Sequence, residues 1–174
     1  GVTMAQLGRI DDAIAKIELA LFINPILKEG YGTLGTLYFR TKAFEKAADL
    51  FKRGAQSFPD DKDFWNNQGY ALEQLKRHDE AFEAFKQAVF VDPGFSRAWE
   101  NLAASAAAGG RRDPILQVPA LIGAMEKDIQ KENFPAALAI ARRVVELLPT
   151  SADAHLSMGN LLFYAGQPDA AEVC

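Results

Sequence analysis

The sequence predicts an all-α fold in which antiparallel helix pairs stack as a solenoid. The first reason is a period of 34 residues, which Pro25, Pro59 and Pro93 follow. The second is that apolar residues recur at three and four positions within each period, as on one face of a helix. The third is the composition, with 49% hydrophobic and 24% charged residues, which excludes a disordered or fibrous chain.

Three further classes of residue keep the same period. They are alanines at Ala13, Ala47 and Ala81, glycines at Gly1, Gly35 and Gly69, and aromatic residues at Tyr31, Trp65 and Trp99. The register then slips, since Pro149 follows Pro93 by 56 residues. We therefore expect an irregular break near residues 109–118, which is either a loop or, in its second part, an extension of the next helix.

The period divides the chain into two blocks of repeats. The block at 1–108 is expected to hold a partial unit at 1–27, full units at 28–61 and 62–95, and a half unit at 96–108. A linker or insertion at 109–117 separates it from the block at 118–174, with a degenerate unit at 118–151 and a partial unit at 152–174. Each full unit is expected to contain two helices joined by a short turn.

Within a unit, small residues and proline have separate structural roles. Gly69 and Ala81 are expected where the two helices approach closely, because a larger side chain would overpack that contact. Met125 takes the place of such a small residue in the degenerate unit, so we expect a wider contact there. Pro93 ends a second helix because its ring cannot continue one. One helix pair cannot bury its own apolar face, so neighbouring pairs must stack.

These positions carry a resemblance to a known family. The segment from Phe64 to Pro93 resembles a tetratricopeptide repeat at Trp65, Gly69, Ala81, Phe85, Ala88 and Pro93. The segment from Gly30 to Pro59 is similar, although Gly54 stands in place of the usual second alanine. The resemblance implies a right-handed superhelix in which the first helix of each pair lines a concave groove.

No pattern in the sequence points to catalysis, a cofactor or a metal. No serine or cysteine nucleophile lies beside a histidine in a familiar elbow, and no glycine-rich phosphate loop occurs. His78 and His155 lack the spacing of metal ligands. We interpret the acidic cluster of Asp60, Asp61 and Asp63 as helix capping. We expect no cofactor and no enzyme activity in this segment, while the activity of a larger parent protein stays open.

Charge and hydropathy narrow the classes of partner. The net charge is −4, and Trp65 and Trp99 fall at a repeat position that indicates packing, so we expect no nucleic acid. No apolar run approaches the roughly 18–20 residues of a membrane helix, so we expect no membrane insertion. The single cysteine, Cys174, cannot form an internal disulfide, and it leaves the compartment undetermined. Of the possible compartments we favour the cytoplasm.

Polar residues on the first helices are candidates for binding a peptide in the groove. They are Thr33, Thr36, Arg40, Asn66, Asn67, Tyr70, Gln74, Arg97 and Asn101. Asn67 and Asn101 share one repeat position, and an amide that both donates and accepts can hold an extended peptide backbone. This pair resembles the asparagine ladder of the O-GlcNAc transferase repeats. The alternative is that both amides are only solvated helix surface, and both interpretations stay open.

We predict a non-catalytic scaffold for protein–protein interaction that binds an extended peptide or a short helix. One alternative is the substrate-recruiting arm of a larger transferase similar to O-GlcNAc transferase. A second is a scaffold that self-assembles into dimers or filaments through its end repeats. The transferase alternative is motivated by the asparagine pair and by Gly1 and Cys174, which fall inside expected helices and suggest a fragment. Self-assembly is motivated by apolar residues near the ends, such as Phe163 and Val173, which such a fragment would expose.

Overall fold

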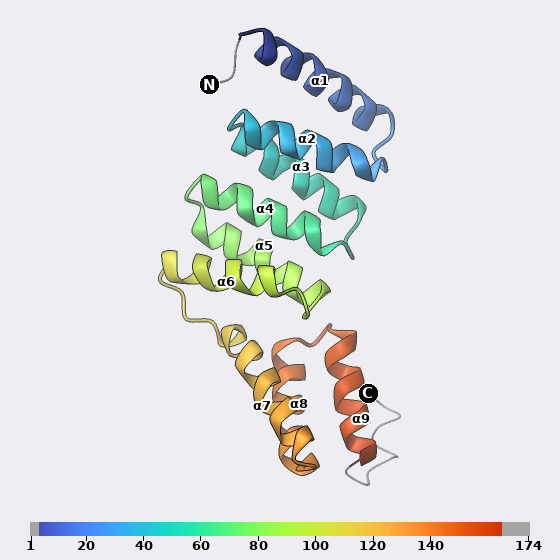
Figure 1. The fold of residues 1–174 in the computed structure, drawn as a ribbon, viewed down its shortest axis with the longest axis vertical. Helices are drawn as coiled ribbons and strands as arrows, with labels where there is room; N and C mark the ends of the chain where they lie inside the picture. Colours follow the sequence, from blue (N-terminus) through green and yellow to red (C-terminus); the bar gives the residue numbers. More distant parts are fainter. Residues whose placement is uncertain (1–3, 165–174) are drawn as a thin grey trace. The chain divides into compact units, whose positions relative to one another are not determined.

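A computed structural model describes residues 4–164, and within that range the chain forms helices and no strand (Figure 1). The helices are α1 (Met4–Ile23), α2 (Lys28–Arg40), α3 (Phe44–Ser57), α4 (Lys62–Gln74), α5 (His78–Val91), α6 (Ser96–Ala108), α7 (Val118–Gln130), α8 (Phe134–Leu147) and α9 (Ala152–Tyr164). The predicted all-α class is confirmed. Gly1, Val173 and Cys174, and with them the end of the expected unit at 152–174, lie outside the described residues.

Packing divides the chain into two compact units, Gly1–Ala88 and Val89–Cys174. In the first unit α2 packs on α3, α3 packs on α4, and α1 packs on α2 (Figure 1). In the second unit α8 packs on both α7 and α9. The boundaries expected at 108 and 118 concern the repeat pattern, and they stay a prediction.

The turns inside the helix pairs repeat as regularly as the helices. Lys42, Lys76 and Glu132 each follow the first helix of a pair in a left-handed conformation, with φ of 58°, 62° and 56°. Gly110 has φ of 68° and follows α6 in the same way. The chain then departs from the pattern, because residues 111–113 form no helix and a 3-10 turn, η1 (Pro114–Gln117), continues directly into α7. Of the two possibilities for the break, the structure shows the second: its later part, η1, extends the next helix.

Glycines in the first unit allow phenylalanine rings to reach the helix backbone. A Cβ atom on Gly69 would lie 2.6 Å from Cε1 of Phe85, and one on Gly54 would lie 2.6 Å from Cδ1 of Phe64. A close contact is therefore present at Gly69, but the nearest group is the Phe85 ring, whereas the sequence predicted the backbone of the other helix. The second glycine explains a departure from the usual repeat, since alanine at residue 54 would collide with Phe64.

Four of the expected repeat junctions carry the same hydrogen bond from a ring to the carbonyl of a proline six residues earlier. The four pairs are Tyr31 Oη with Pro25 O at 2.9 Å, Trp65 Nε1 with Pro59 O at 3.0 Å, Trp99 Nε1 with Pro93 O at 2.8 Å, and His155 Nε2 with Pro149 O at 3.0 Å. The two tryptophans are half-buried at these junctions. Their indole N–H groups are thus used within the fold.

Candidate functional site

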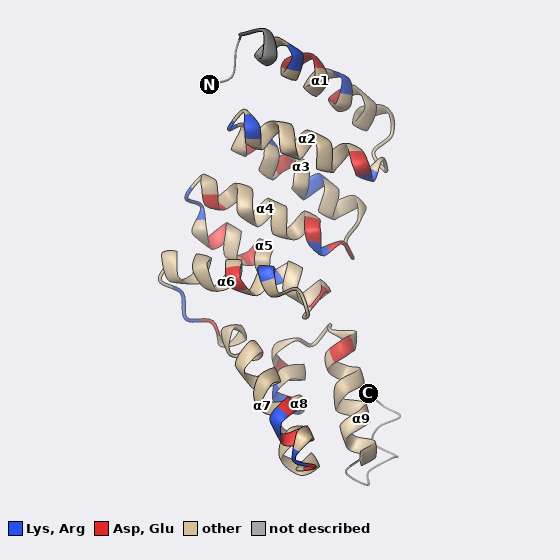
Figure 2. Ribbon diagram, in the orientation of Figure 1, with Lys and Arg blue, Asp and Glu red and all other residues tan. Residues whose placement is uncertain are grey.

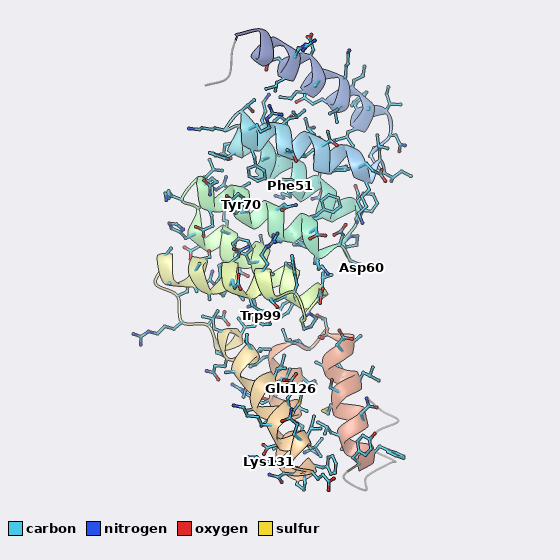
Figure 3. All side chains as sticks on the ribbon, in the orientation of Figure 1. Phe51, Asp60, Tyr70, Trp99, Glu126 and Lys131 are labelled. Carbon is cyan, nitrogen blue, oxygen red and sulfur yellow. The ribbon has the colours of Figure 1, made fainter. Side chains whose placement is uncertain are left out.

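Seven of the predicted groove residues lie in the first unit, on α2 and α4. Thr33, Thr36 and Arg40 are exposed on α2, and Tyr70 and Gln74 are exposed on α4 with Asn67 half-buried beside them. The rings of Tyr70 on α4 (Figure 3) and Phe39 on α2 meet edge to face, with centroids 5.3 Å apart. This contact joins the two helices into one surface, which we call the α2–α4 face.

The threonine hydroxyls of the α2–α4 face are less available than their sequence positions indicate. Thr33 Oγ1 donates to the carbonyl of Glu29 at 3.0 Å, and Thr36 Oγ1 donates to the carbonyl of Gly32 at 3.0 Å. A hydroxyl has one proton, so each oxygen keeps only its accepting capacity toward a ligand. Hydrogen-bond donors on this face must therefore come from Arg40, Asn67, Tyr70 and Gln74.

Asn66 differs from the expectation that it lines the groove. It is 6% exposed and takes part in an interaction inside the chain. Each residue turns an α-helix by 100°, so Asn66 falls to one side of the exposed stripe made by Asn67, Tyr70 and Gln74. Asn66 is thus a structural residue and not part of the accessible surface, although it is adjacent in sequence to Asn67.

The two asparagines that share a repeat position have different surroundings. Within the described part of the chain, the Asn67 side chain makes no hydrogen bond. Asn101, on α6 of the second unit, is half-buried and already has an interaction partner, and Arg97 lies exposed one turn before it. The equivalence seen in the sequence therefore does not extend to the surroundings, and Asn67 is the amide available to a ligand.

The second unit contains a cleft that the sequence did not predict. Two cavities, of about 170 and 440 Å³, lie among α7, α8 and α9 and share Met125 and Ser157 in their linings. Ser157 occupies the same repeat position as Asn67 and Asn101. We call these two adjacent cavities the α7–α9 cleft. The signal in the sequence was Met125, because a flexible side chain replaces the small residue of the other units.

A third cavity, of about 550 Å³, lies among α1, α2 and α3 in the first unit. Its lining contains both signs of charge, with Glu18 and Asp49 opposed by Lys46 and Arg53. Tyr38 donates a hydrogen bond to the Glu18 carboxylate. Burial, together with this hydrogen bond, raises the pKa of Tyr38 above its ordinary value.

Charges elsewhere are dispersed and locally paired. Figure 2 shows both signs interspersed along α1 to α5. Lys28 Nζ lies 2.7 Å from Asp61 Oδ2, and this bond raises the pKa of Lys28. Asp61 also accepts a hydrogen bond from the backbone N–H of Asp63 at 2.9 Å, which confirms the predicted helix cap.

Two negative findings apply to the described residues. Nowhere in residues 4–164 do three or more His, Cys, Asp or Glu side chains gather closely enough to hold a metal ion. Over the same range, each helix is too short or too polar to cross a membrane.

Comparison with known sequences identifies the repeat. Residues 33–94 match the family model described as tetratricopeptide repeat. The peroxisomal targeting signal receptor of Kluyveromyces lactis is 38% identical over 72 residues, which are 41% of this chain and 13% of the receptor. Protein FlbA of Caulobacter vibrioides is 32% identical over 101 residues, which are 58% of this chain and 17% of that protein. The chain thus covers under a fifth of either relative.

Solved structures share the fold at low sequence identity. A crystal structure of MamA has a TM-score of 0.54 and 16% identity, with 99% of this chain and 90% of that chain covered. A tetratricopeptide repeat protein from Parabacteroides merdae has a TM-score of 0.53 and 16% identity, with 97% and 57% covered. These likenesses support the same arrangement of antiparallel helix pairs, and the predicted solenoid class is confirmed.

Proposed function

The chain is a tetratricopeptide repeat protein, and we propose that it is a non-catalytic scaffold that binds an extended peptide or a short helix of a partner protein. The observation that carries the proposal is the α2–α4 face, where the unbonded Asn67 amide lies beside the 48% exposed ring of Tyr70. The amide can pair with a peptide backbone, and the ring offers apolar area.

The relatives support a ligand that is itself a segment of protein. Several of them are named as receptors for a peroxisomal targeting signal. The match covers 41% of this chain, and residues 33–94, where the repeats are clearest, include most of the α2–α4 face. By analogy with these named receptors, we propose that the α2–α4 face of this chain recognises a signal segment of a partner protein.

The test is a peptide array probed with the wild type and with Asn67→Ala. We expect the variant to lose affinity for its bound peptides by about five- to tenfold, which corresponds to about 1 kcal/mol for one hydrogen bond. Helicity measured by circular dichroism is expected to stay unchanged, because Asn67 lies outside the packed contacts. The matched control is Gln56→Ala, which removes an exposed amide from α3. Equal binding by wild type and Asn67→Ala would contradict the assignment of this face.

Self-assembly is a second candidate, supported by exposed apolar side chains near the end of α1. Phe22 is 81% exposed, Ile23 is 73% exposed and Ile26 is 71% exposed. Burying such residues against another copy would be favourable. Sedimentation over a range of concentrations tests this, with Phe22→Ser as the variant expected to weaken association. A species that stays monomeric at high concentration contradicts it. The role as the recruiting arm of a transferase stays a prediction from the sequence.

A further inference from the structure

We propose that the α7–α9 cleft binds a peptide segment in which an apolar side chain is flanked by lysine or arginine. This inference rests on the proposed function, and it adds the chemical class of the peptide and a second place of contact. Its evidence is the apolar floor of the cleft, the sign of the charges at its rim, and the polar groups between them.

The floor of the cleft is apolar and comes from all three helices. The smaller cavity is lined by Ile122 and Met125 from α7, by Ala141 and Val144 from α8 with Leu148 directly after that helix, and by Ala154 from α9. An enclosed apolar cavity of about 150 Å³ is large enough to bind benzene. The volume of about 170 Å³ therefore suits one leucine, methionine or phenylalanine side chain.

The rim of the cleft carries negative charge. Glu126 (Figure 3) and Asp153 line the smaller cavity, and Glu132 lines the larger one. All three are exposed and have no ion-pair partner in the described part of the chain. The cationic residues of α7 and α8 are absent from both linings, and one of them, Arg143, pairs with Glu146 at 2.7 Å. A cationic segment would meet three uncompensated carboxylates, whereas an acidic one would be repelled.

Polar groups between floor and rim can hold the backbone of the segment. Ser157 lines both cavities, and Asn160 lines the larger one. Within residues 4–164 neither side chain makes a hydrogen bond. An amide and a hydroxyl one helical turn apart on α9 can each donate to and accept from a peptide backbone. The cleft thus combines an apolar anchor site, backbone contacts and an acidic rim.

The first arm of the test uses the wild type alone. The probe is a nine-residue peptide, acetylated and amidated, with a central leucine flanked by two lysines on each side. Two comparison peptides replace the lysines by glutamate or the leucine by alanine. Fluorescence anisotropy is expected to give at least tenfold tighter binding of the lysine–leucine peptide than of either comparison peptide. Its affinity is expected to fall as salt rises. Equal affinities for the lysine and glutamate peptides, or no binding of the probe, would overturn the inference.

The second arm locates the binding in the cleft. Glu126→Gln/Asp153→Asn removes two charges at nearly constant size, and we expect it to weaken binding of the lysine–leucine peptide about five- to tenfold. The control Asp11→Asn/Asp12→Asn removes two exposed charges from α1 and is expected to leave binding unchanged. Loss of probe affinity in Asn67→Ala but not in the cleft variant would overturn this inference and support the proposed function. Loss in the cleft variant alone would support the cleft, and the peptide array with Asn67→Ala tests the α2–α4 face separately.

Discussion

In both compact units a large side chain on one helix of a pair packs against a small residue on the other. The two units place the large and the small residue on opposite helices. In the first unit Gly69 on α4 faces the large ring of Phe85 on α5. In the second unit the equivalent positions, 56 residues later, hold the large Met125 on α7 and the small Ala141 on α8. Met125 is 8% exposed, so the exchange still buries both side chains. The repeat therefore tolerates reversal of large and small residues as long as both change together.

The exchange has a consequence for the surface. A phenylalanine ring fills the space between its helices in the first unit. Methionine is unbranched and alanine is short, and both line the smaller cavity of the α7–α9 cleft. The first unit accordingly presents a polar face where α4 packs on α5, while the second presents a hollow with an acidic rim at the equivalent helix pair. A degenerate repeat can thus be the place where a binding site forms.

The largest effect is expected where the first unit is most tightly packed. Gly69→Leu should lower the free energy of unfolding by about 3 kcal/mol, because its Cβ alone would lie 2.6 Å from the Phe85 ring. Gln74→Leu, at an exposed position of the same helix, should change it by less than about 0.5 kcal/mol. Chemical denaturation followed by circular dichroism measures both. A reversed order would show that the helix faces are wrongly assigned.

Exchanging the large and the small residue between α7 and α8 tests whether their placement creates the cleft of the second unit. Met125→Gly/Ala141→Phe gives α7 and α8 the residues of α4 and α5, and the ring should fill the smaller cavity. We expect binding of the lysine–leucine peptide to weaken at least fivefold, with a change in unfolding free energy of about 1 kcal/mol. Ala141→Phe alone should overpack Met125 and destabilise more than the double variant. Unchanged peptide binding in the folded double variant would show that the exchange of large and small residues at Met125 and Ala141 does not form the peptide site.

Alkaline pH should act on the first unit through Tyr38. Its pKa is raised in the folded state, so the stabilisation is present below the unfolded pKa of about 10 and is lost as pH rises above it. Between about pH 10 and 12 we expect wild type to lose about 1 kcal/mol more than Tyr38→Phe. Denaturation midpoints of both proteins across this range measure the difference. Parallel curves would show that the contact with Glu18 does not control the titration.

The smallest effect is expected at a glycine that no neighbour approaches. A Cβ on Gly123 of α7 would meet no atom within 4 Å, in contrast with Gly69. Gly123→Ala should therefore raise the unfolding free energy by about 0.5–1 kcal/mol, because alanine is the better helix former. Thermal denaturation is sufficient to detect it. Destabilisation would indicate that the backbone of α7 is approached more closely than the structure indicates.

The period predicted the helices because proline, glycine and alanine act through the local backbone. Pro93 lies between α5 and α6 as the pattern predicts, and a close contact is present at Gly69, with the Phe85 ring as the nearest group. The site was harder to predict, because accessibility depends on neighbours distant in the sequence. Asn66 and Asn67 differ by one residue and by 100° around the helix, and only one is available. The α7–α9 cleft needs side chains from three helices, which no single spacing reveals.

The hydrogen bonds from a ring to a proline carbonyl show that a repeat junction can keep the same bond while the residue that donates it changes. Phenol, indole and imidazole differ in size and shape, yet Tyr31, Trp65, Trp99 and His155 all reach the same acceptor six residues back. What they share is a polar hydrogen at the tip of a flat side chain. Protein engineers who build new arrays can therefore vary the type of ring at this junction from one module to the next. A phenylalanine at this position would leave the proline carbonyl without its hydrogen bond.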